Sequence, residues 1–328
     1  MSKPRPICDS CSLDRRDFLK TLGHVASAGA VLPLLGSASH VFAAPSAESA
    51  AETAVGQFYS TLTEAQRKVI CFGIDHDLRK KVNANWHVTK PTVGDDFYSK
   101  EQRALIGEIV KNVTSEDGYE RLLKQMEDDD GGLDFYSVAV FGEPGKGTFE
   151  WELTGRHLTL RADGNGIEGA AFGGPIVYGH GEEAPKDNLF HYQTQQANEV
   201  FKALDPAQAK QALRPRAPGE AQVALQGRNG QFPGVAVGTL SADQQKLVQE
   251  TLGVLLNPYR KEDVDEVMAT LAANGGIESL HMAFYQQGDL NNDKVWDIWR
   301  VEGPGFVWHF RGAPHVHAYI NIGAVGRV

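Results

Sequence analysis

The sequence predicts an α+β protein built on an antiparallel β-sheet, with a C-terminal meander and flanking helical blocks. Signals for helix starts gather in two parts of the chain, and segments in which apolar and polar residues alternate gather in two others. Helices and strands that stay in separate blocks are typical of this class, whereas a regular alternation of strand and helix would indicate a parallel sheet.

The composition of the chain indicates which kinds of partner it is expected to bind. The chain has 328 residues, of which 41% are hydrophobic and 23% charged, as in globular proteins. Its 32 Lys and Arg against 42 Asp and Glu give a net charge of −10, which disfavours binding to a phosphate backbone. We therefore expect no nucleic acid among the partners.

Residues 1–43 resemble a twin-arginine export signal. Arg15-Arg16 precedes an apolar run of small residues over 22–35, which is too short to span a bilayer stably, and Val41-Phe42-Ala43 offers a cleavage site. We expect the twin-arginine translocase to export the chain to the periplasm, with no membrane span left after cleavage. The alternative is an uncleaved N-terminal anchor helix. Because the resemblance implies export of folded protein, often with a metal or cofactor already inserted, it favours a metal-binding function.

Residues 44–56 are rich in Ala, Ser, Glu and Thr and predict a flexible tether, followed by a single α+β domain over 57–328. In the domain, four predicted helix starts have the pattern of a capping box. The side chain of a Ser, Thr or Asp can cap the helix, and the side chain of a Gln three residues later can accept a hydrogen bond from the backbone N–H of that capping residue. A fifth helix is expected over about 262–273. The four capping pairs are Thr63 with Gln66, Ser99 with Gln102, Asp205 with Gln208, and Ser241 with Gln244.

Seven segments alternate with the period of a strand, and turns rich in Gly and Pro separate those near the C-terminus. The last four therefore predict a meander. The seven segments are 135–141, 148–154, 157–161, 280–286, 294–301, 305–310 and 315–322.

Histidines gather in the last predicted strands. His315, His317 and Tyr319 share one face, because alternate side chains of a strand point the same way. Two imidazoles on one face can converge on a metal ion, and Tyr319 can then act in catalysis as a proton carrier. His309 on the preceding strand and His157 in the middle of the chain are the candidates for a further ligand.

Three interpretations of these residues remain open. The first is a periplasmic metalloprotein with one transition metal, copper or iron, that acts as an oxidoreductase on an unidentified small molecule. The second is a zinc hydrolase, in which Glu152 or Glu150 would activate a metal-bound water. The third is a metal-free periplasmic binding or assembly module whose histidines are structural.

A series of short motifs runs along most of the chain. The motifs are Phe58-Tyr59 with Gln66, Phe141-Gly142-Glu143-Pro144, Trp151-Glu152-Leu153-Thr154-Gly155-Arg156-His157, Phe172-Gly173-Gly174-Pro175 and His315-Val316-His317. Their order resembles the DUF3500 family, which is uncharacterised, so the resemblance implies no activity. The family more often has two adjacent histidines where this chain has Arg156-His157. The resemblance therefore carries a ligand role over to His157 and not to Arg156.

Overall fold

The computed structural model describes residues 44–325, which belong to one compact unit. The expected export signal and its cleavage site lie outside the described residues. Within 44–325, no helix has the length and apolar character that crossing a membrane requires.

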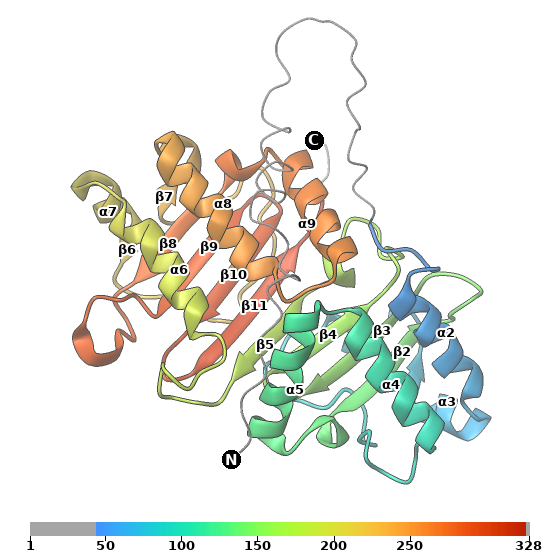
Figure 1. Cartoon of the computed structure of the whole chain (residues 1–328). Coiled ribbons are helices and arrows are strands. Elements are labelled where there is room, and N and C mark those ends of the chain that lie inside the picture. Colours follow the sequence, from blue (N-terminus) through green and yellow to red (C-terminus); the bar gives the residue numbers. More distant parts are fainter. Residues whose placement is uncertain (1–43, 326–328) are drawn as a thin grey trace, which may run out of the picture. The chain divides into compact units, whose positions relative to one another are not determined.

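The described residues form an 11-stranded sheet with helices beside it, so the predicted α+β class is confirmed (Figure 1). Ten strands follow one another in the order β1-β2-β3-β4-β5-β11-β10-β9-β8-β6, and β7 pairs with β8. The pairs β1–β2 and β6–β8 are parallel and the others antiparallel. All seven predicted strands are present, and the last four form the expected meander. The strands are β1 (Cys71–Phe72), β2 (Ser137–Gly142), β3 (Phe149–Gly155), β4 (Leu158–Ala162), β5 (Ile176–His180), β6 (Leu213–Arg214), β7 (Val235–Ala236), β8 (His281–Tyr285), β9 (Ile298–Gly303), β10 (Phe306–Arg311) and β11 (Val316–Ile322).

Eight α-helices lie in the described part of the chain. Four of them, α3, α4, α7 and α8, begin with the predicted capping boxes, and in each box both reciprocal hydrogen bonds are present. The helix expected near 262–273 is α9. The helices are α2 (Ala50–Thr61), α3 (Glu64–Ile70), α4 (Lys100–Asn112), α5 (Glu116–Asp130), α6 (His191–Lys202), α7 (Pro206–Ala212), α8 (Ala242–Leu256) and α9 (Lys261–Ala273).

Ser241 gives a test of the capping assignment. Its hydroxyl accepts a hydrogen bond from the backbone N–H of Gln244 at 3.3 Å, and the Gln244 side chain accepts one from the Ser241 N–H at 2.9 Å. Replacing Ser241 by Ala should lower the free energy of unfolding by about 1 kcal/mol and leave any metal content unchanged. Urea denaturation and elemental analysis check both expectations. Loss of metal at unchanged stability would contradict a purely structural role for this helix start.

The prediction of a tether over 44–56 is wrong from Ala50 onward. Helix α2 begins there and buries Ala51, Val55 and Phe58 in the main apolar core. Glu52 on the same helix forms two hydrogen bonds with the guanidinium of Arg260, at 2.7 and 2.8 Å. The segment is ordered because its alanines, which look like low-complexity sequence, lie at helical spacing on the face that packs.

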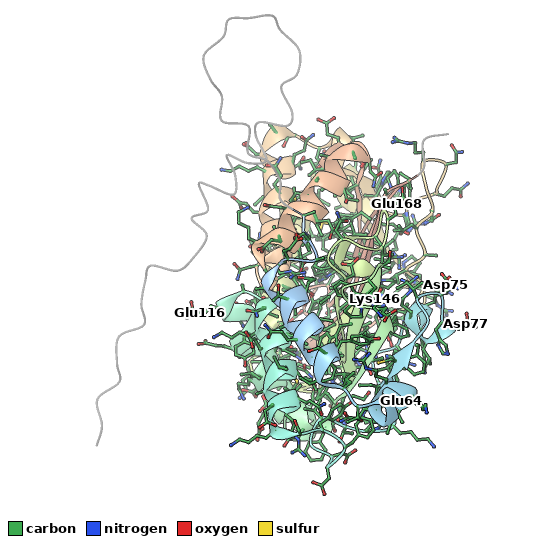
Figure 2. All side chains as sticks on the ribbon, turned by 90° about the vertical axis from the view of Figure 1, so that its right-hand side faces the viewer. Glu64, Asp75, Asp77, Glu116, Lys146 and Glu168 are labelled. Atoms are coloured by element: carbon green, nitrogen blue, oxygen red, sulfur yellow. The ribbon has the colours of Figure 1, made fainter. Side chains whose placement is uncertain are left out.

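The two faces of the sheet differ in what covers them. Trp151 of β3 belongs to the main apolar core, to which α2, α4 and α5 also contribute. Its neighbour Glu150 points to the opposite face, where Arg79 from a connecting segment reaches it at 3.2 Å. Figure 2 shows the sheet from the side, with Glu116 on the helical side and Asp75 among the connecting segments on the other.

The two halves of the sheet repeat one another. The side-chain amides of Gln66 and Gln102 exchange hydrogen bonds, and those of Gln208 and Gln244 do the same. Equivalent residues are 142 positions apart in both cases (208 − 66 and 244 − 102). The strand order shows the same repeat. From one edge of the sheet the order is β1-β2-β3-β4-β5, and from the other edge it is β6-β8-β9-β10-β11. The antiparallel pair β5–β11 therefore lies at a pseudo-two-fold axis that relates a first half, ending with β5, to a second half.

Candidate metal centre

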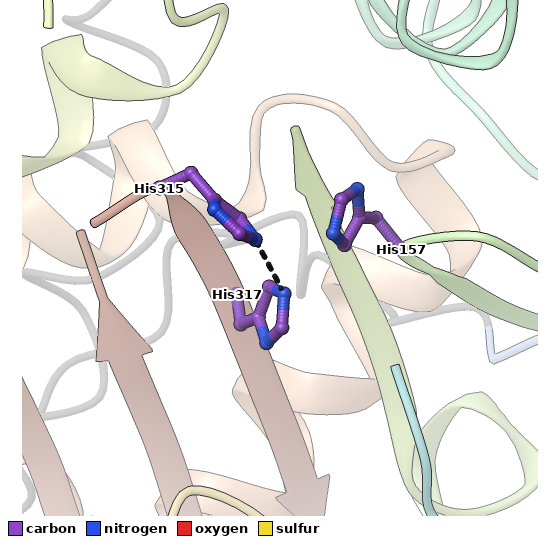
Figure 3. Close-up of side chains that lie close together, drawn as sticks. All are labelled: His157, His315 and His317. Atoms are coloured by element: carbon purple, nitrogen blue, oxygen red, sulfur yellow. Dashed lines mark hydrogen bonds between the residues drawn. The ribbon is translucent and has the colours of Figure 1, made fainter. Parts of the chain in front are cut away.

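Three histidines from distant parts of the chain meet where β5 and β11 pair (Figure 3). One ring nitrogen from each of His157, His315 and His317 lies within 4.8 Å of the other two. The Nε2 atoms of His315 and His317 are 3.1 Å apart. Nitrogens that bind one ion tetrahedrally, at the ligand distances usual for zinc, are about 3.3 Å apart. His315 and His317 thus already have the spacing of two ligands, and His157 needs a shift of about 1.5 Å to complete the set.

His157 is held in an unusual backbone conformation. It is the second residue of the two-residue loop between Gly155 and Leu158, and its φ of +56° lies in a region that few residues other than glycine adopt. Its N–H donates to the carbonyl of Ala84 at 2.6 Å, and its Nδ1 is 2.7 Å from Oδ2 of Asp129. Because Nδ1 is engaged, Nε2 is the nitrogen available to a metal ion.

Asp129 holds the His157 ring from α5. Its Oδ2 also accepts a hydrogen bond from the side chain of Gln125 at 2.7 Å, and its Oδ1 accepts one from the N–H of Gly181 at 2.8 Å. Burial opposes ionisation of this carboxyl, but the hydrogen bonds from His157 and Gln125 outweigh it and lower the pKa of Asp129. Asp129 is therefore a charged acceptor that fixes the orientation of His157.

Gly179 makes room for the cluster. It lies opposite His317 in the β5–β11 pair. A Cβ at this position would lie 3.2 Å from the Cβ of His157 and 2.2 Å from the carbonyl oxygen of Val316. Because there is no side chain, the rings of His157 and His317 can approach to a centroid distance of 4.8 Å.

His317 has a carboxylate partner of its own. Its Nδ1 is 3.2 Å from Oε1 of Glu220, which lies on the connecting segment that follows β6. The other Glu220 oxygen is 3.1 Å from Nε of Arg311, the residue opposite His317 on β10. Two of the three histidines are thus oriented by carboxylates, as ligands of metal ions commonly are.

The cluster is suited to neutral imidazoles. Burial, together with the charges of His317 and Arg311, lowers the pKa of His315 to about 4. The pKa of His317 is lowered as well, chiefly by burial. Both rings are therefore neutral at physiological pH, which is the state in which imidazole binds a metal ion.

His309 does not join the other three histidines. It pairs with Tyr319, so it lies on the same sheet face as His317 but two residue pairs further along the strands. Burial and the charge of Arg300 lower the pKa of His309 to about 3, so the ring is a buried neutral imidazole. Tyr319 does lie beside the cluster, with its ring centroid 6.5 Å from that of His317.

Glu152, expected to activate a water, is also placed away from the cluster. It lies opposite Arg161, which is four residues along β4 from His157, or about 13 Å at the usual rise of a strand. Its side chain is fully buried, and neither carboxylate oxygen has a hydrogen-bond partner among residues 44–325. Burial raises the pKa of Glu152 to about 8, although Arg161 at 3.5 Å opposes the shift.

This raised pKa predicts a dependence of stability on pH. The folded state holds the Glu152 proton that the unfolded chain releases above about pH 4.5, so stability is lost as pH rises from about 4.5 to about 8. Replacing Glu152 by Gln removes this loss, and the variant should gain stability relative to the wild type across that window. Urea denaturation at pH 5, 7 and 9 measures the difference. A difference that is the same at all three values would contradict a buried protonated carboxyl.

Sequence reasoning missed the two carboxylates that orient the histidines. Asp129 lies in an acidic run at the end of α5 that looks solvated, yet Leu122, Gln125 and Asp129 follow helical spacing and could have indicated an inward face. Glu220 lies in a segment without secondary structure, where no periodicity marks a buried side.

Comparison with known proteins supports the family resemblance. No curated protein and no solved structure matches the chain. A family model described as a protein of unknown function, DUF3500, matches residues 45–321. The match spans the part of the chain from before α2 to within β11 and includes all three clustered histidines. The chain therefore belongs to the DUF3500 family.

Proposed function

We propose that the protein is an exported metalloprotein that binds one transition metal ion through His157, His315 and His317. The observation that carries the proposal is the convergence of three imidazoles, two of them oriented by carboxylates, at one point of the sheet. Three protein ligands leave a coordination position for a small molecule, which is typical of catalytic rather than structural metal sites.

An oxidoreductase that uses copper or iron is the activity we propose first. Imidazole nitrogens suit both metals, and either would supply electron transfer to a small-molecule substrate. His315 and His317 are partly exposed, with the side chain of His317 14% exposed, and this exposed side is where a small molecule would approach the metal ion. Tyr319 keeps its proton at neutral pH, because burial raises its pKa to about 12, and its hydroxyl is a proton carrier beside the site.

A zinc hydrolase is the second candidate. The pairing of ligand histidines with Asp129 and Glu220 favours it, since carboxylate–histidine pairs are a common feature of zinc sites. In such a site Glu220 would orient the metal ligand, because it contacts Nδ1 of His317, the ring nitrogen that faces away from the other two histidines.

Elemental analysis of the mature protein, purified from its native compartment, tests these proposals. We expect about one copper or iron atom per chain and, after oxidation, an electron paramagnetic resonance signal with coupling to imidazole nitrogens. One zinc atom per chain without such a signal would favour the hydrolase. No stoichiometric metal would defeat both and leave a metal-free binding or assembly module with structural histidines.

Export is tested separately. Replacing Arg15 and Arg16 together by Lys should leave a full-length precursor in the cytoplasm, because the proposed signal depends on the arginine pair. Cell fractionation and the mass of the protein check this, with Arg5→Lys as a control outside the pair. Normal export of the double variant would contradict the proposed twin-arginine route and periplasmic location.

A further inference from the structure

We propose a second ligand site, a cleft at the β6–β8–β9 edge of the sheet that binds a small organic carboxylate. It goes beyond the proposed function and does not depend on it. The cleft has a volume of about 640 Å³, which is within the usual range for small-molecule sites. Its charged and hydrogen-bonding lining includes Arg214, Arg216, Gln222, Tyr285, Arg300 and Glu302.

The cleft is positively charged in a protein whose net charge is −10. Three arginines line it, and two of them, Arg214 and Arg216, are exposed. The carboxylate of Glu302 accepts two hydrogen bonds from Arg300, at 2.8 and 3.0 Å, and one from Gln226 at 2.8 Å. Glu302 therefore neutralises Arg300 and leaves the charges of Arg214 and Arg216 for a ligand.

Two buried donors of the cleft have no partner within residues 44–325. These are Nη1 of Arg300 and the hydroxyl of Tyr285, in side chains that are 4% and 1% exposed. A buried polar group without a partner costs about 1–3 kcal/mol, so protein interiors rarely leave one unmatched. A ligand that offers hydrogen-bond acceptors would satisfy both.

The arrangement of these donors follows from the strands. Arg214 of β6 is paired with Tyr285 of β8, and both lie at the same end of the parallel pair. Burial raises the pKa of Tyr285 to about 12, so its hydroxyl keeps its proton and can donate. The positive charges of Arg300 and Arg214 and the negative charge of Glu302 all act on this hydroxyl, and all three side chains line the same cleft.

The lining also indicates the class of anion. The planar guanidinium groups of arginine match the two oxygens of a carboxylate. Ala217, Pro218 and Pro233 add an apolar wall that an inorganic ion would leave uncovered. A carboxylate attached to an apolar body fits both features.

The cleft and the histidine cluster share a wall. Ala221 and Gln222 line the cleft, whereas Glu220, the residue before them, contacts His317. The carbonyl of Gln222 accepts a hydrogen bond from Arg300 at 2.8 Å. The two sites are therefore distinct neighbours, and loss of a metal ligand should leave the cleft intact.

Isothermal titration calorimetry of the mature protein with benzoate, benzamide and inorganic phosphate tests the proposal. Benzoate should bind, and neutral benzamide and phosphate should bind at least about tenfold more weakly. Tyr285→Phe should weaken benzoate about tenfold without lowering the melting temperature, because the hydroxyl that it removes has no partner in the described structure. Arg216→Ser should weaken benzoate as well.

Two control variants make the outcome decisive. Arg228→Ser removes an exposed arginine that does not line the cleft, and His317→Ala removes a proposed metal ligand. Both should bind benzoate with the affinity of the wild type. The proposal is overturned if benzoate does not bind, if phosphate binds more tightly, or if Tyr285→Phe and Arg216→Ser leave the affinity unchanged. Loss of benzoate binding in His317→Ala would assign the anion to the histidine cluster instead.

Discussion

Replacing His317 by Ala should abolish stoichiometric metal binding, with a loss of affinity of at least about 100-fold. His317 supplies one nitrogen of the closest pair in the cluster, 3.1 Å from His315, and two remaining histidines cannot complete a three-ligand site. Its ring is half-buried and the strand continues without it, so the fold should persist. Calorimetric titration with Cu²⁺ and Zn²⁺, together with circular dichroism, measures both expectations.

Two variants control this experiment. His87→Ala removes an exposed imidazole outside the cluster and should bind metal like the wild type. Asp129→Asn keeps the size of the residue that holds His157 but removes its charge, and should weaken binding about 10- to 100-fold. Unchanged metal affinity in His317→Ala would refute the proposed metal centre.

Replacing Arg260 by Met should cost about 3–5 kcal/mol of stability, because it leaves buried carboxylates without their cation. Arg260 bonds Glu52 twice and lies 3.0 Å from Asp263, and all three side chains are buried. Burial raises the pKa of Asp263 to about 8 even with Arg260 present. Since protonation relieves the uncompensated charge, the deficit of the variant should be smaller at pH 5 than at pH 8.

Lys261→Ala is the matched control, since Lys261 is the adjacent residue and its ion pair with Asp265 is largely exposed on the lysine side. It should cost less than about 1 kcal/mol. Denaturant titrations of both variants at the two pH values separate the effects. Equal losses in the two variants, or a deficit of Arg260→Met that does not change with pH, would show that the Glu52–Arg260 pair is not a buried electrostatic anchor.

The strands and capped helices were predictable because their signals are local. A capping box needs two residues three positions apart, and a strand face needs only alternation, so Ser241 and the face shared by His315 and His317 follow from short segments. Glu52 shows what local sequence signals cannot predict. Its helix is stabilised by Arg260, which is 208 positions away in the sequence, and no local pattern reveals that partner.

Distance in the sequence also explains why two of the candidate residues lie away from the histidine cluster. Antiparallel pairing of β10 with β11 was expected to bring His309 close, but the register places Arg311, not His309, opposite His317. Register depends on the turn between the strands, which the sequence does not specify at the level of one residue pair. Glu152 is distant for a similar reason, because it lies on β3 opposite Arg161, four residues along the chain from His157.

The repeat explains why residues 44–325 hold one histidine cluster rather than two. In the first half, Asp129 accepts the N–H of Gly181 and holds His157. In the second half, Asn274 accepts the N–H of Val325 at 3.2 Å in the corresponding way. His157 is the loop residue directly before β4. The corresponding residue of the second half, directly before β10, is Gly305. The second position therefore has neither the imidazole nor the charge that would orient it.

A metal ion at the remaining position would join the two halves of the protein. His157 comes from the first half and His315 from the second, 158 positions later (315 − 157). An ion that binds only when these halves are paired stabilises their assembly, by about 2.7 kcal/mol at a free concentration 100 times its dissociation constant. Neither half alone holds more than two of the three ligands. The ion would therefore bind only after β5 and β11 have paired, and it would then stabilise the folded arrangement of the two halves.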